Sequence, residues 1–482
     1  MGDTVRELAP YLLSGVALVA DVWAVSHALL YRRDVRSTIA WFSVIVLLPL
    51  LGASLYLVLG INRIKRRALK LRGEPSRAPQ ASVERCPAER VCERVDAPHM
   101  RTLIALVDRV VHSPVTAGNH VSLLVDGDEA YAAMIAAIDA AARSVALTTY
   151  IFDNDRAGAR FVDALARAHE RGVEVRVLID AVGARYSRPP ITRSLARAGV
   201  PCALFLATRI PGRLRYINLR THRKIMVVDG RLGFTGGMNI REGTLLSLQP
   251  RPRHPIADLH AKIEGPVVAQ LQETFADDWE FAARERLEGD AWFPALSPAG
   301  EVFARGIPDG PDEDFEELRM TLLGALAVAQ RRVQLVTPYF VPDATLISAL
   351  NIAALRGVRI DIVLPERGNL RLVQWASAAN LWQVLERGCK VWLTPPPFDH
   401  TKLMVVDDVW TLIGSGNWDA RSLRLNFEFN LECYDQALAA DASELVSRRI
   451  AAARELQLDE VLTRPLPVRV RDGLARLLSP YL

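Results

Sequence analysis

The stretch THRKIMVVDG, residues 221–230, and the stretch HTKLMVVDD, residues 400–408, share one pattern of polar residues. Each contains His-x-Lys-x4-Asp followed by a Gly and an Asn, so five identities recur at offsets 0, 2, 7, 14 and 17 from the His. The two copies begin 178 residues apart (400 − 222). Because chance rarely produces such a repeat, we predict a single active site built from two halves of the chain.

The first copy predicts a strand that turns back on itself. Lys224 to Val228 is rich in β-forming residues, and Asp229-Gly230 is a typical tight-turn pair. Residues two apart on a strand share a face, so His222 and Lys224 should point to the same side. The returning strand would then place Asn239 beside His222, and the glycines before Asn239 allow a close backbone approach.

The second copy should close in the same way, and the repetition extends beyond the motifs. Its corresponding residues are His400, Lys402, Asp407, Ser415 and Asn417. Further upstream, 149–152 precedes 171–175 in the first half much as 338–341 precedes 356–360 in the second. Each half reads as strand, helix, strand and motif hairpin. This order predicts an α/β fold with two tandem halves, each a mixed sheet flanked by helices.

The paired motifs supply what chemistry at a phosphodiester needs. A neutral imidazole can attack phosphorus, and an imidazolium can protonate the leaving oxygen. Histidine suits both roles near neutral pH because its reference pKa is about 6.5. Lysine and asparagine side chains can hold the non-bridging oxygens, so this scheme needs no metal and no cofactor. The five cysteines are scattered without a CxxC pair, which predicts neither a disulfide framework nor a zinc site.

These residues resemble the phospholipase D superfamily, whose doubled HxKx4Dx6GSxN motif they match with one departure. Gly237 stands where the first copy would usually carry a Ser. The contexts TPYFVPD at 337–343, SGNWDARSLRLNFE at 415–428 and AWFSVIVLLPLLGASLYLVLG at 40–60 resemble bacterial cardiolipin synthases. The resemblance covers nearly the whole chain, and it implies the phospholipase D-like fold.

The resemblance also implies a phosphatidyl transfer in two steps. One phosphatidylglycerol would give its phosphatidyl group to a histidine and release glycerol, and a headgroup hydroxyl of a second would then attack to give cardiolipin. By analogy His222 is the nucleophile and His400 acts as acid and then base, while the symmetry of the motifs leaves that order open. Asn239, Asn417 and Ser415 are the candidate phosphate ligands.

Other functions compatible with the motifs are a membrane-bound phospholipase D that hydrolyses its lipid, and a transferase that uses phosphatidylethanolamine as donor. A soluble phosphodiesterase or nuclease of the same superfamily would lack the apolar N-terminal region. A membrane scaffold with a degenerate fold is a non-enzymatic alternative, and the intact His, Lys and Asn of both copies argue against it.

Four acids accompany the motifs. A catalytic histidine gains a fixed tautomer when a carboxylate binds its other ring nitrogen. Glu428 resembles the histidine-orienting acid of the family, and Asp258, after the first motif, is the corresponding candidate. The motif acids Asp229 and Asp407 belong to the candidate catalytic set, but a residue seven after His lies at the far end of a strand. We therefore expect them to act mainly in the structure of the hairpin turn.

The N-terminal region predicts a membrane anchor over residues 1–72. Residues 38–61 form a run of 24 without a charge, long enough for a helix to cross a bilayer core of about 30 Å. Residues 9–31 are also apolar apart from Asp21 and His27, which makes them a second candidate span. For Asp21 we favour a helix-to-helix hydrogen bond over a functional role.

Basic residues flank the predicted spans unevenly, which predicts the orientation. Three lie between the spans, and six follow the second: Arg63, Lys65, Arg66, Arg67, Lys70 and Arg72. The heavier side should be cytoplasmic, so we expect a multi-pass protein of the bacterial inner membrane with its catalytic part in the cytoplasm. The partners expected are the membrane and a phospholipid substrate, phosphatidylglycerol. A net charge of +4 is too modest to indicate nucleic-acid binding.

Composition divides the rest of the chain. Residues 73–100 are rich in Pro, Ser, Ala and charge and predict a linker, followed by a first half at 101–300 and a second at 301–482. Two basic stretches leave alternatives open. Arginines between 209 and 223 can attract an anionic headgroup or pair within the structure. The segment 464–482 alternates arginines with leucines and fits either a membrane-surface helix or a helix packed on the second half.

Overall fold

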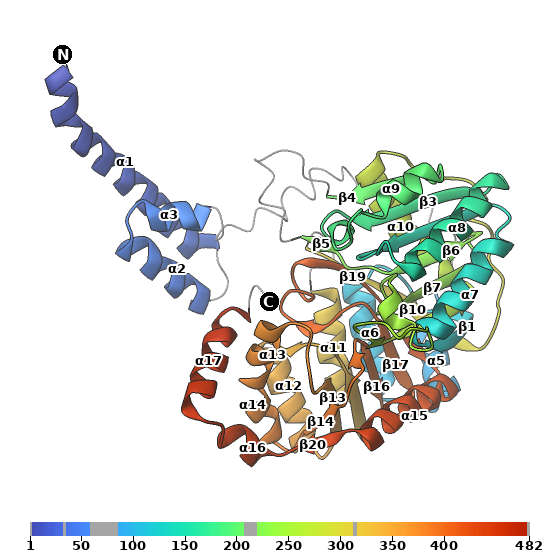
Figure 1. Cartoon of the computed structure of the whole chain (residues 1–482). Coiled ribbons are helices and arrows are strands. Elements are labelled where there is room, and N and C mark those ends of the chain that lie inside the picture. The colour runs from blue at the N-terminus through green and yellow to red at the C-terminus, as the bar shows by residue number, and fades with distance from the viewer. Residues whose placement is uncertain (1, 32–34, 58–84, 207–218, 312–315, 480–482) are drawn as a thin grey trace. The chain divides into compact units, whose positions relative to one another are not determined.

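The N-terminal residues form their own helical unit. The computed structural model describes residues 2–31, 35–57, 85–206, 219–311 and 316–479, and it divides into the units Met1–Leu71 and Arg72–Leu482. In the first unit α1 (Gly2–Tyr31) is continuous, and α2 (Val35–Leu47) and α3 (Leu51–Leu55) pack on it (Figure 1). Among the described residues, Ser14–Tyr31 is the one helical stretch long and apolar enough to cross a membrane.

The predicted unbroken helix over 38–61 is wrong. α2 ends at Leu47, and the chain turns before α3 begins. Pro49 explains the break, because it lacks an N–H and disfavours helical geometry at the residue before it. Leu50 then adopts φ 62°, and its amide donates to Asp21 Oδ1 at 3.0 Å. Asp21 thus makes the predicted helix-to-helix hydrogen bond, and residues 58–61 lie outside the described residues.

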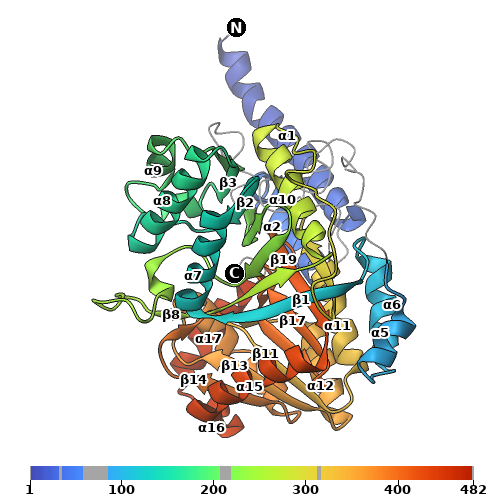
Figure 2. The ribbon, with the colours of Figure 1, turned by 90° about the vertical axis from the view of Figure 1, so that its right-hand side faces the viewer.

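The second unit is built on one 16-stranded sheet in which the two halves repeat the same strand order. The first half runs β4-β3-β2-β6-β7-β9-β1, the second runs β10-β19-β17-β16-β11-β13-β14-β20, and the sixteenth strand, β5, pairs with β19 off this path. Antiparallel pairing of β1 with β10 joins them, and β1 crosses between the green and orange strands in Figure 2.

The strands are as follows. Those of the first half are β1 (Thr116–Val125), β2 (Ser144–Thr149), β3 (Glu174–Asp180), β4 (Cys202–Phe205), β5 (Arg220–Thr221), β6 (Ile225–Val228), β7 (Leu232–Gly236), β8 (Ile256–Ala257) and β9 (Leu259–Glu264). Those of the second half are β10 (Val302–Asp309), β11 (Arg332–Val336), β12 (Phe340–Val341), β13 (Arg359–Pro365), β14 (Lys390–Thr394), β15 (Phe398–Asp399), β16 (Leu403–Val406), β17 (Trp410–Gly414), β18 (Trp418–Asp419), β19 (Asn426–Tyr434) and β20 (Arg454–Leu456).

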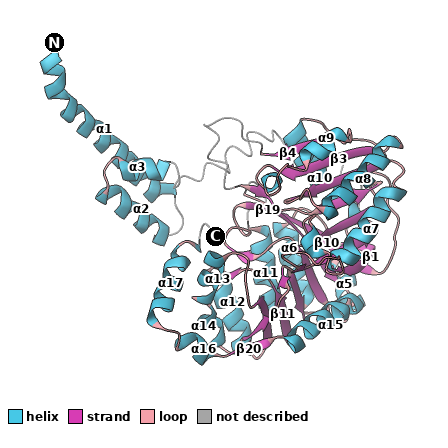
Figure 3. Cartoon of the chain, viewed as in Figure 1, coloured by secondary structure: helices cyan, strands magenta, loops and turns pink. Residues whose placement is uncertain are grey.

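Helices cover both faces of this sheet, as Figure 3 shows by colour. On one face α10 (Val268–Ala283) and α15 (Gln436–Ala452) share a core with strands of both halves. On the other, α7 (Asp126–Ala140) and α8 (Arg156–Glu170) cover the first half, and α6 (Met100–Val110), α11 (Glu317–Val328) and α12 (Ala344–Leu355) cover the second. Shorter helices are α5 (Ala88–Arg94), α9 (Thr192–Arg197), α13 (Arg371–Ala378), α14 (Leu381–Leu385), α16 (Leu458–Leu462) and α17 (Leu466–Leu477), with 3-10 turns at Gly183–Arg185 and Glu242–Thr244. The predicted α/β architecture is confirmed.

Both motif hairpins form where the sequence predicts them. β6 pairs antiparallel with β7, and β16 pairs antiparallel with β17. The reversals use left-handed backbone, with φ 53° and 63° at Asp229 and Gly230 and φ 53° and 58° at Asp407 and Asp408. Asp and Gly tolerate that geometry, which explains why the runs of β-forming residues end at these pairs.

Part of the predicted linker folds. Residues 85–100 contain α5, where Val91 is fully buried, and the amide of Cys86 donates to the carbonyl of Val115 at 2.8 Å. This segment joins the core that also contains α11 and β11. A seven-residue helix is hard to see in a polar sequence because its apolar residues find their partners far along the chain. Residues 73–84 lie outside the described residues, and the boundary between the halves at 300/301 stays a prediction.

Candidate active site

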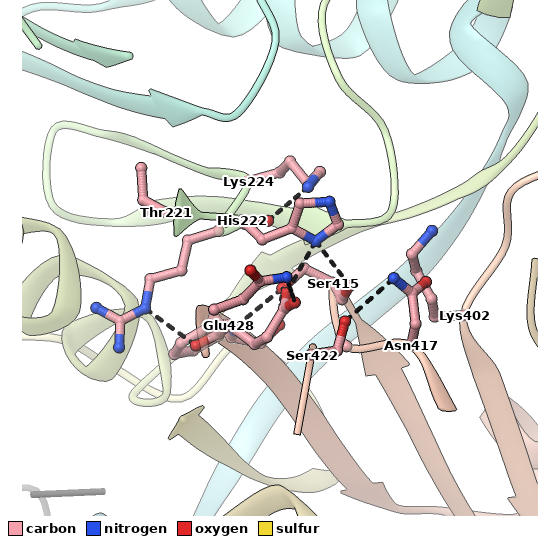
Figure 4. Close-up of polar contacts among 12 residues, drawn as sticks. Thr221, His222, Lys224, Lys402, Ser415, Asn417, Ser422 and Glu428 are labelled. Carbon is pink, nitrogen blue, oxygen red and sulfur yellow. Dashed lines mark hydrogen bonds and ion pairs between the residues drawn. The ribbon is translucent and has the colours of Figure 1, made fainter. Parts of the chain in front are cut away.

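His222 is carried into the site by a strand of the first half that pairs with a strand of the second. β5 runs parallel to β19, and the amide of His222 donates to the carbonyl of Phe427 at 2.8 Å. This pairing brings Nδ1 of His222 to 3.1 Å from Oε2 of Glu428 and 3.3 Å from the carbonyl oxygen of Ser415 (Figure 4). With a proton on Nδ1, His222 keeps the lone pair of Nε2 for chemistry.

Glu428 is buried and held as a carboxylate. Ser415 Oγ donates to its Oε2 at 2.5 Å, and Asn426 Nδ2 donates to its Oε1 at 3.1 Å. Burial alone would raise the pKa of Glu428, but His222, Lys224 and Ser415 together hold it below the ordinary value. The charge beside His222 is therefore fixed by three neighbours.

His400 is placed by the same arrangement with the two halves exchanged. β15 runs parallel to β8, and the amide of His400 donates to the carbonyl of Ala257 at 2.7 Å. Its Nδ1 lies 2.9 Å from Oδ2 of Asp258, which is buried. Burial raises the pKa of Asp258 to about 6. The second histidine thus has a carboxylate partner that holds its negative charge less firmly than Glu428 does.

The carboxylates cross between the halves. Asp258 follows the first motif but binds the histidine of the second, and Glu428 follows the second motif but binds the histidine of the first. Both residues were predicted to orient the histidines, and the sequence did not indicate that each serves the histidine of the other half. The crossing means that neither histidine is oriented until the two halves have docked.

The two motif lysines lie beside the histidines in buried surroundings. Nζ of Lys224 donates to the carbonyl of His222 at 2.5 Å, and Nζ of Lys402 donates to that of His400 at 2.5 Å. Nζ of Lys402 also lies 2.9 Å and 3.0 Å from the ring nitrogens of His400. Burial lowers the pKa of Lys224 to about 7 and that of Lys402 to about 8.

Both histidine pKa values lie below the ordinary value. Burial is the main cause for each, and the neighbouring lysines add to it. Glu428 opposes the drop at His222, and the pKa of His400 lies well below the ordinary value. A phosphodiester anion between the lysines would supply the negative charge that the site lacks and would raise all four pKa values. The arrangement is suited to an anionic phosphate group.

The predicted phosphate ligands have partners of their own. Asn239 Oδ1 accepts from the amide of Ile151 at 3.0 Å, and Asn417 Nδ2 donates to Ser422 Oγ at 3.1 Å. Ser415 is fully buried and its hydroxyl is engaged by Glu428, so we describe it as a positioning residue for His222. Figure 4 shows Ser415 next to His222 and Glu428, with Asn417, Ser422 and Lys402 to one side of them.

Two tyrosines were missed as site residues. The ring centroids of Tyr150 and His222 lie 5.1 Å apart. Nζ of Lys224 lies 5.7 Å from the centroid of the Tyr150 ring. The ring of Tyr339 lies 6.1 Å from that of His400. Each stands second in its repeat segment, 149–152 or 338–341, so the internal repetition was the signal that could have identified them.

The motif acids lie away from the histidines and bind backbone. Asp229 accepts hydrogen bonds from the amides of residues 142–144, and Asp407 accepts them from the amides of residues 330–332 and from His99 Nε2. These contacts tie each hairpin turn to the start of the neighbouring strand. They accord with a structural role.

The structure describes some of the arginines between 209 and 223 and leaves others out. Arg223 is buried, and its guanidinium pairs with Asp278 at 2.8 Å and donates to the carbonyl of Glu428 at 3.0 Å. It therefore pairs within the structure and is not exposed to a headgroup. Arg209, Arg213 and Arg215 lie outside the described residues.

Comparison with protein families places the chain. Residues 134–279 and 322–450 match the family described as "Cardiolipin synthase, PLD-like domain", which includes both motifs and more than half of the chain. Residues 19–60 match the family described as "Phospholipase D-nuclease N-terminal". The chain belongs to the cardiolipin synthase family.

Curated cardiolipin synthases are similar along almost the full length. "Major cardiolipin synthase ClsA" of Bacillus subtilis (strain 168) is 31% identical over 462 residues, covering 94% of this chain and 95% of that protein. "Cardiolipin synthase A" of Pseudomonas entomophila (strain L48) is 32% identical over 481 residues, covering 98% and 99%.

A solved structure shares the fold of this cardiolipin synthase family member. The phosphatidylserine synthase of Haemophilus influenzae Rd KW20 aligns with a TM-score of 0.62 and 18% identity, covering 79% of this chain and 100% of that one. At that identity the likeness concerns the fold alone.

Proposed function

We propose that this protein synthesises cardiolipin by transferring the phosphatidyl group of one phosphatidylglycerol to a second, through a phosphohistidine and with release of glycerol. The observation that carries the proposal is the crossed pair of His–carboxylate contacts, His222 with Glu428 and His400 with Asp258. Two oriented imidazoles beside two buried lysines provide a nucleophile, an acid and a site for the phosphate charge.

In the first step Nε2 of His222 attacks phosphorus while His400 protonates the departing glycerol oxygen. The N–P bond forms as the P–O bond breaks, and the proton of His400 leaves with glycerol. The phosphorylated imidazole of His222 carries a positive charge, and the carboxylate of Glu428 at 3.1 Å stabilises it. Because Glu428 holds its charge more firmly than Asp258, we assign His222 as the nucleophile.

In the second step neutral His400 takes the proton from the headgroup hydroxyl of the second phosphatidylglycerol. The oxygen of that hydroxyl bonds to phosphorus, the N–P bond breaks, and His222 returns to its neutral state. The same group thus serves as acid and then as base. Asp258 keeps the ring of His400 in one tautomer throughout both steps.

An alcohol must compete with the far more abundant water. We propose that the N-terminal unit anchors the protein in the bacterial inner membrane with the catalytic unit on the cytoplasmic side. The six basic residues between Arg63 and Arg72 support this orientation. A site held at the bilayer surface meets lipid hydroxyls at high local concentration, which favours transfer over hydrolysis.

The test is to incubate the purified full chain with phosphatidylglycerol in mixed micelles without divalent cations and to follow the lipids by mass spectrometry. We expect cardiolipin with an equal amount of glycerol, and loss of both in His222→Ala and in His400→Ala. Phosphatidic acid in place of cardiolipin would make the protein a hydrolase. Turnover only after phosphatidylethanolamine is added would identify a different donor.

The assignment of the nucleophile has its own test. In a His400→Ala variant the acid and base are missing, so a slowly formed phosphohistidine should accumulate and map to His222. A label that maps to any other residue would overturn the assignment.

A further inference from the structure

The last helix of the chain carries an apolar face that packs on nothing in the described unit. Four large side chains of α17 are between 52% and 71% exposed: Leu466, Val470, Leu474 and Leu477. At about 100° per residue these positions form one continuous stripe along the helix. The opposite face, with Asp472 and Ala475 buried, packs against α13. The alternative of a helix packed on the second half is confirmed for one face, and the exposed face leaves the membrane-surface alternative open.

The charges of α17 are arranged around that stripe. Arg469 and Arg476 flank it on one side and Arg471 on the other, and all three are exposed. The single acid of the helix, Asp472, is buried and pairs with Arg464 at 2.8 Å and with Arg471 at 2.7 Å. The outward surface thus presents leucine and arginine without negative charge, which is the pattern of a helix that lies in the surface of an anionic bilayer.

Further exposed apolar side chains lie on α13, which contacts α17, and on α16, which precedes it. Leu370 and Leu372, at the start of α13, are 50% and 38% exposed, and Leu462 in α16 is 46% exposed. A patch this long on a globular unit marks an interaction surface. We refer to the stripe of α17 together with Leu370, Leu372 and Leu462 as the α13–α17 face.

A cavity shares Leu370 with this face and Tyr339 with the surroundings of His400. It has a volume of about 360 Å³, within the range of small-molecule pockets, and its lining includes Leu370, Val373, Leu381, Val461 and Tyr339. Leu370 belongs to the exposed face, whereas Tyr339 lies at the site with its ring 6.1 Å from that of His400. The lining also includes the charged residues Glu366, Arg454, Glu460 and Arg464, so the cavity is apolar in part and charged in part. A cavity of this mixed character suits a molecule with an acyl chain and a charged group.

We infer that the α13–α17 face is a membrane-docking surface that seats the catalytic unit on an anionic phospholipid bilayer. The inference rests on the proposed function, which requires a lipid substrate, and adds the surface by which the catalytic unit meets it. A bilayer fits the observations better than a protein partner because exposed arginines border an apolar stripe on both sides, and the one acid of α17 is buried.

The experiment uses the full chain reconstituted in vesicles of phosphatidylglycerol and phosphatidylcholine. A variant with Val470→Ser, Leu474→Ser and Leu477→Ser is compared with wild type on two substrates, the vesicle lipid and a dispersed short-chain phosphatidylglycerol. We expect the variant to lose about ten-fold in rate on the vesicle lipid and to match wild type on the dispersed substrate. The matched control is Ile352→Ser with Leu355→Ser on α12, two exposed side chains outside this face, and it should match wild type on both.

The other outcomes contradict either the inference or the proposed function. Equal loss on both substrates would contradict a docking role, because dispersed lipid does not need the face, and unchanged rates on both would mean that the face does not engage the bilayer. A change of oligomeric state in the triple variant alone would assign the face to a second copy of the chain. Wild type that makes no cardiolipin from either substrate would instead contradict the proposed function.

Discussion

Gly237 and Ser415 occupy equivalent motif positions but meet different carboxylates. Ser415 donates a hydrogen bond to Glu428 at 2.5 Å, which stabilises the negative charge of this carboxylate beside His222. A Cβ added at Gly237 would lie 2.2 Å from Oδ1 of Asp258, so a side chain there would push that carboxylate away from His400. The departure from the usual Ser is explained by the close approach of Asp258, and it leaves the two histidines with unequal partners.

We therefore predict that Gly237→Ser, which restores the usual motif, lowers kcat by about a hundred-fold because it displaces Asp258. Ser415→Ala removes the hydrogen bond to Glu428 and those with the backbone of Phe429 without a clash, and should cost only about ten-fold. Steady-state rates of cardiolipin formation measure both. A Gly237→Ser variant as active as wild type would show that Asp258 can move without loss.

The buried lysines predict the alkaline side of the pH profile. Lys224 has a pKa of about 7 and Lys402 one of about 8, and a lysine loses its charge as the pH rises through its pKa. Since the proposed mechanism uses both ammonium groups to bind the phosphate, kcat/KM should fall between about pH 7 and pH 8.5. The fall in kcat should come at higher pH, because bound phosphodiester raises both pKa values.

The measurement is kcat/KM for phosphatidylglycerol across pH 5.5 to 9.5 on wild type and on Lys224→Arg. Arginine stays charged, so the variant should be slower overall but should keep its rate to higher pH. A wild-type profile that stays flat through pH 9 would contradict the assigned lysine roles.

At the scale of the element, the motif hairpin explains why an acid seven residues after His recurs. Asp229 and Asp407 each stand at a left-handed turn position and each accept hydrogen bonds from three successive amides of the neighbouring strand segment. A carboxylate that accepts from three successive amides stabilises the turn and fixes the strand beside it.

We predict that Asp229→Asn and Asp407→Asn each lower the free energy of unfolding of the catalytic unit by about 1–3 kcal/mol, with a smaller effect on kcat. Thermal unfolding in detergent together with the transfer rate separates the two effects. Asp163→Asn, at an exposed position on α8, is the matched control and should change neither. Normal unfolding with abolished turnover would assign these acids to the chemistry.

Elements with a local signal could be predicted, whereas those formed by distant partners could not. The hairpins were predictable because β-forming runs end at Asp229-Gly230 and Asp407-Asp408. The helix break at Pro49 could also have been predicted, but a count of uncharged residues over 38–61 alone did not show it. In contrast, α5 and the crossed pairing of Asp258 and Glu428 depend on which distant strands meet, since β8 pairs with β15 and β5 with β19. A single sequence shows which side chains repeat but not which half supplies the partner.

At the scale of the whole molecule, the continuous sheet and the crossed carboxylates make the two halves one catalytic body. β1 pairs with β10, and β10 pairs in turn with β19, the strand that carries Glu428. Two short parallel pairings then deliver each histidine to an acid of the other half. Every group that the proposed mechanism uses is therefore supplied by one chain, so a second chain is not needed to complete the site.

This arrangement predicts that full-length His222→Ala and His400→Ala chains do not rescue each other. Each variant lacks one imidazole of its own site, and the missing imidazole of one chain cannot reach the acid of another while the sheet stays continuous through β1 and β10. The two inactive variants, reconstituted together in the same vesicles, should make no more cardiolipin than either does alone. Mixtures of each variant with wild type should retain the activity of the wild-type share, which controls for poisoning by the inactive chain. Recovery of activity in the mixture of variants would mean that halves from two chains dock on each other, and the site would then belong to an exchanged dimer.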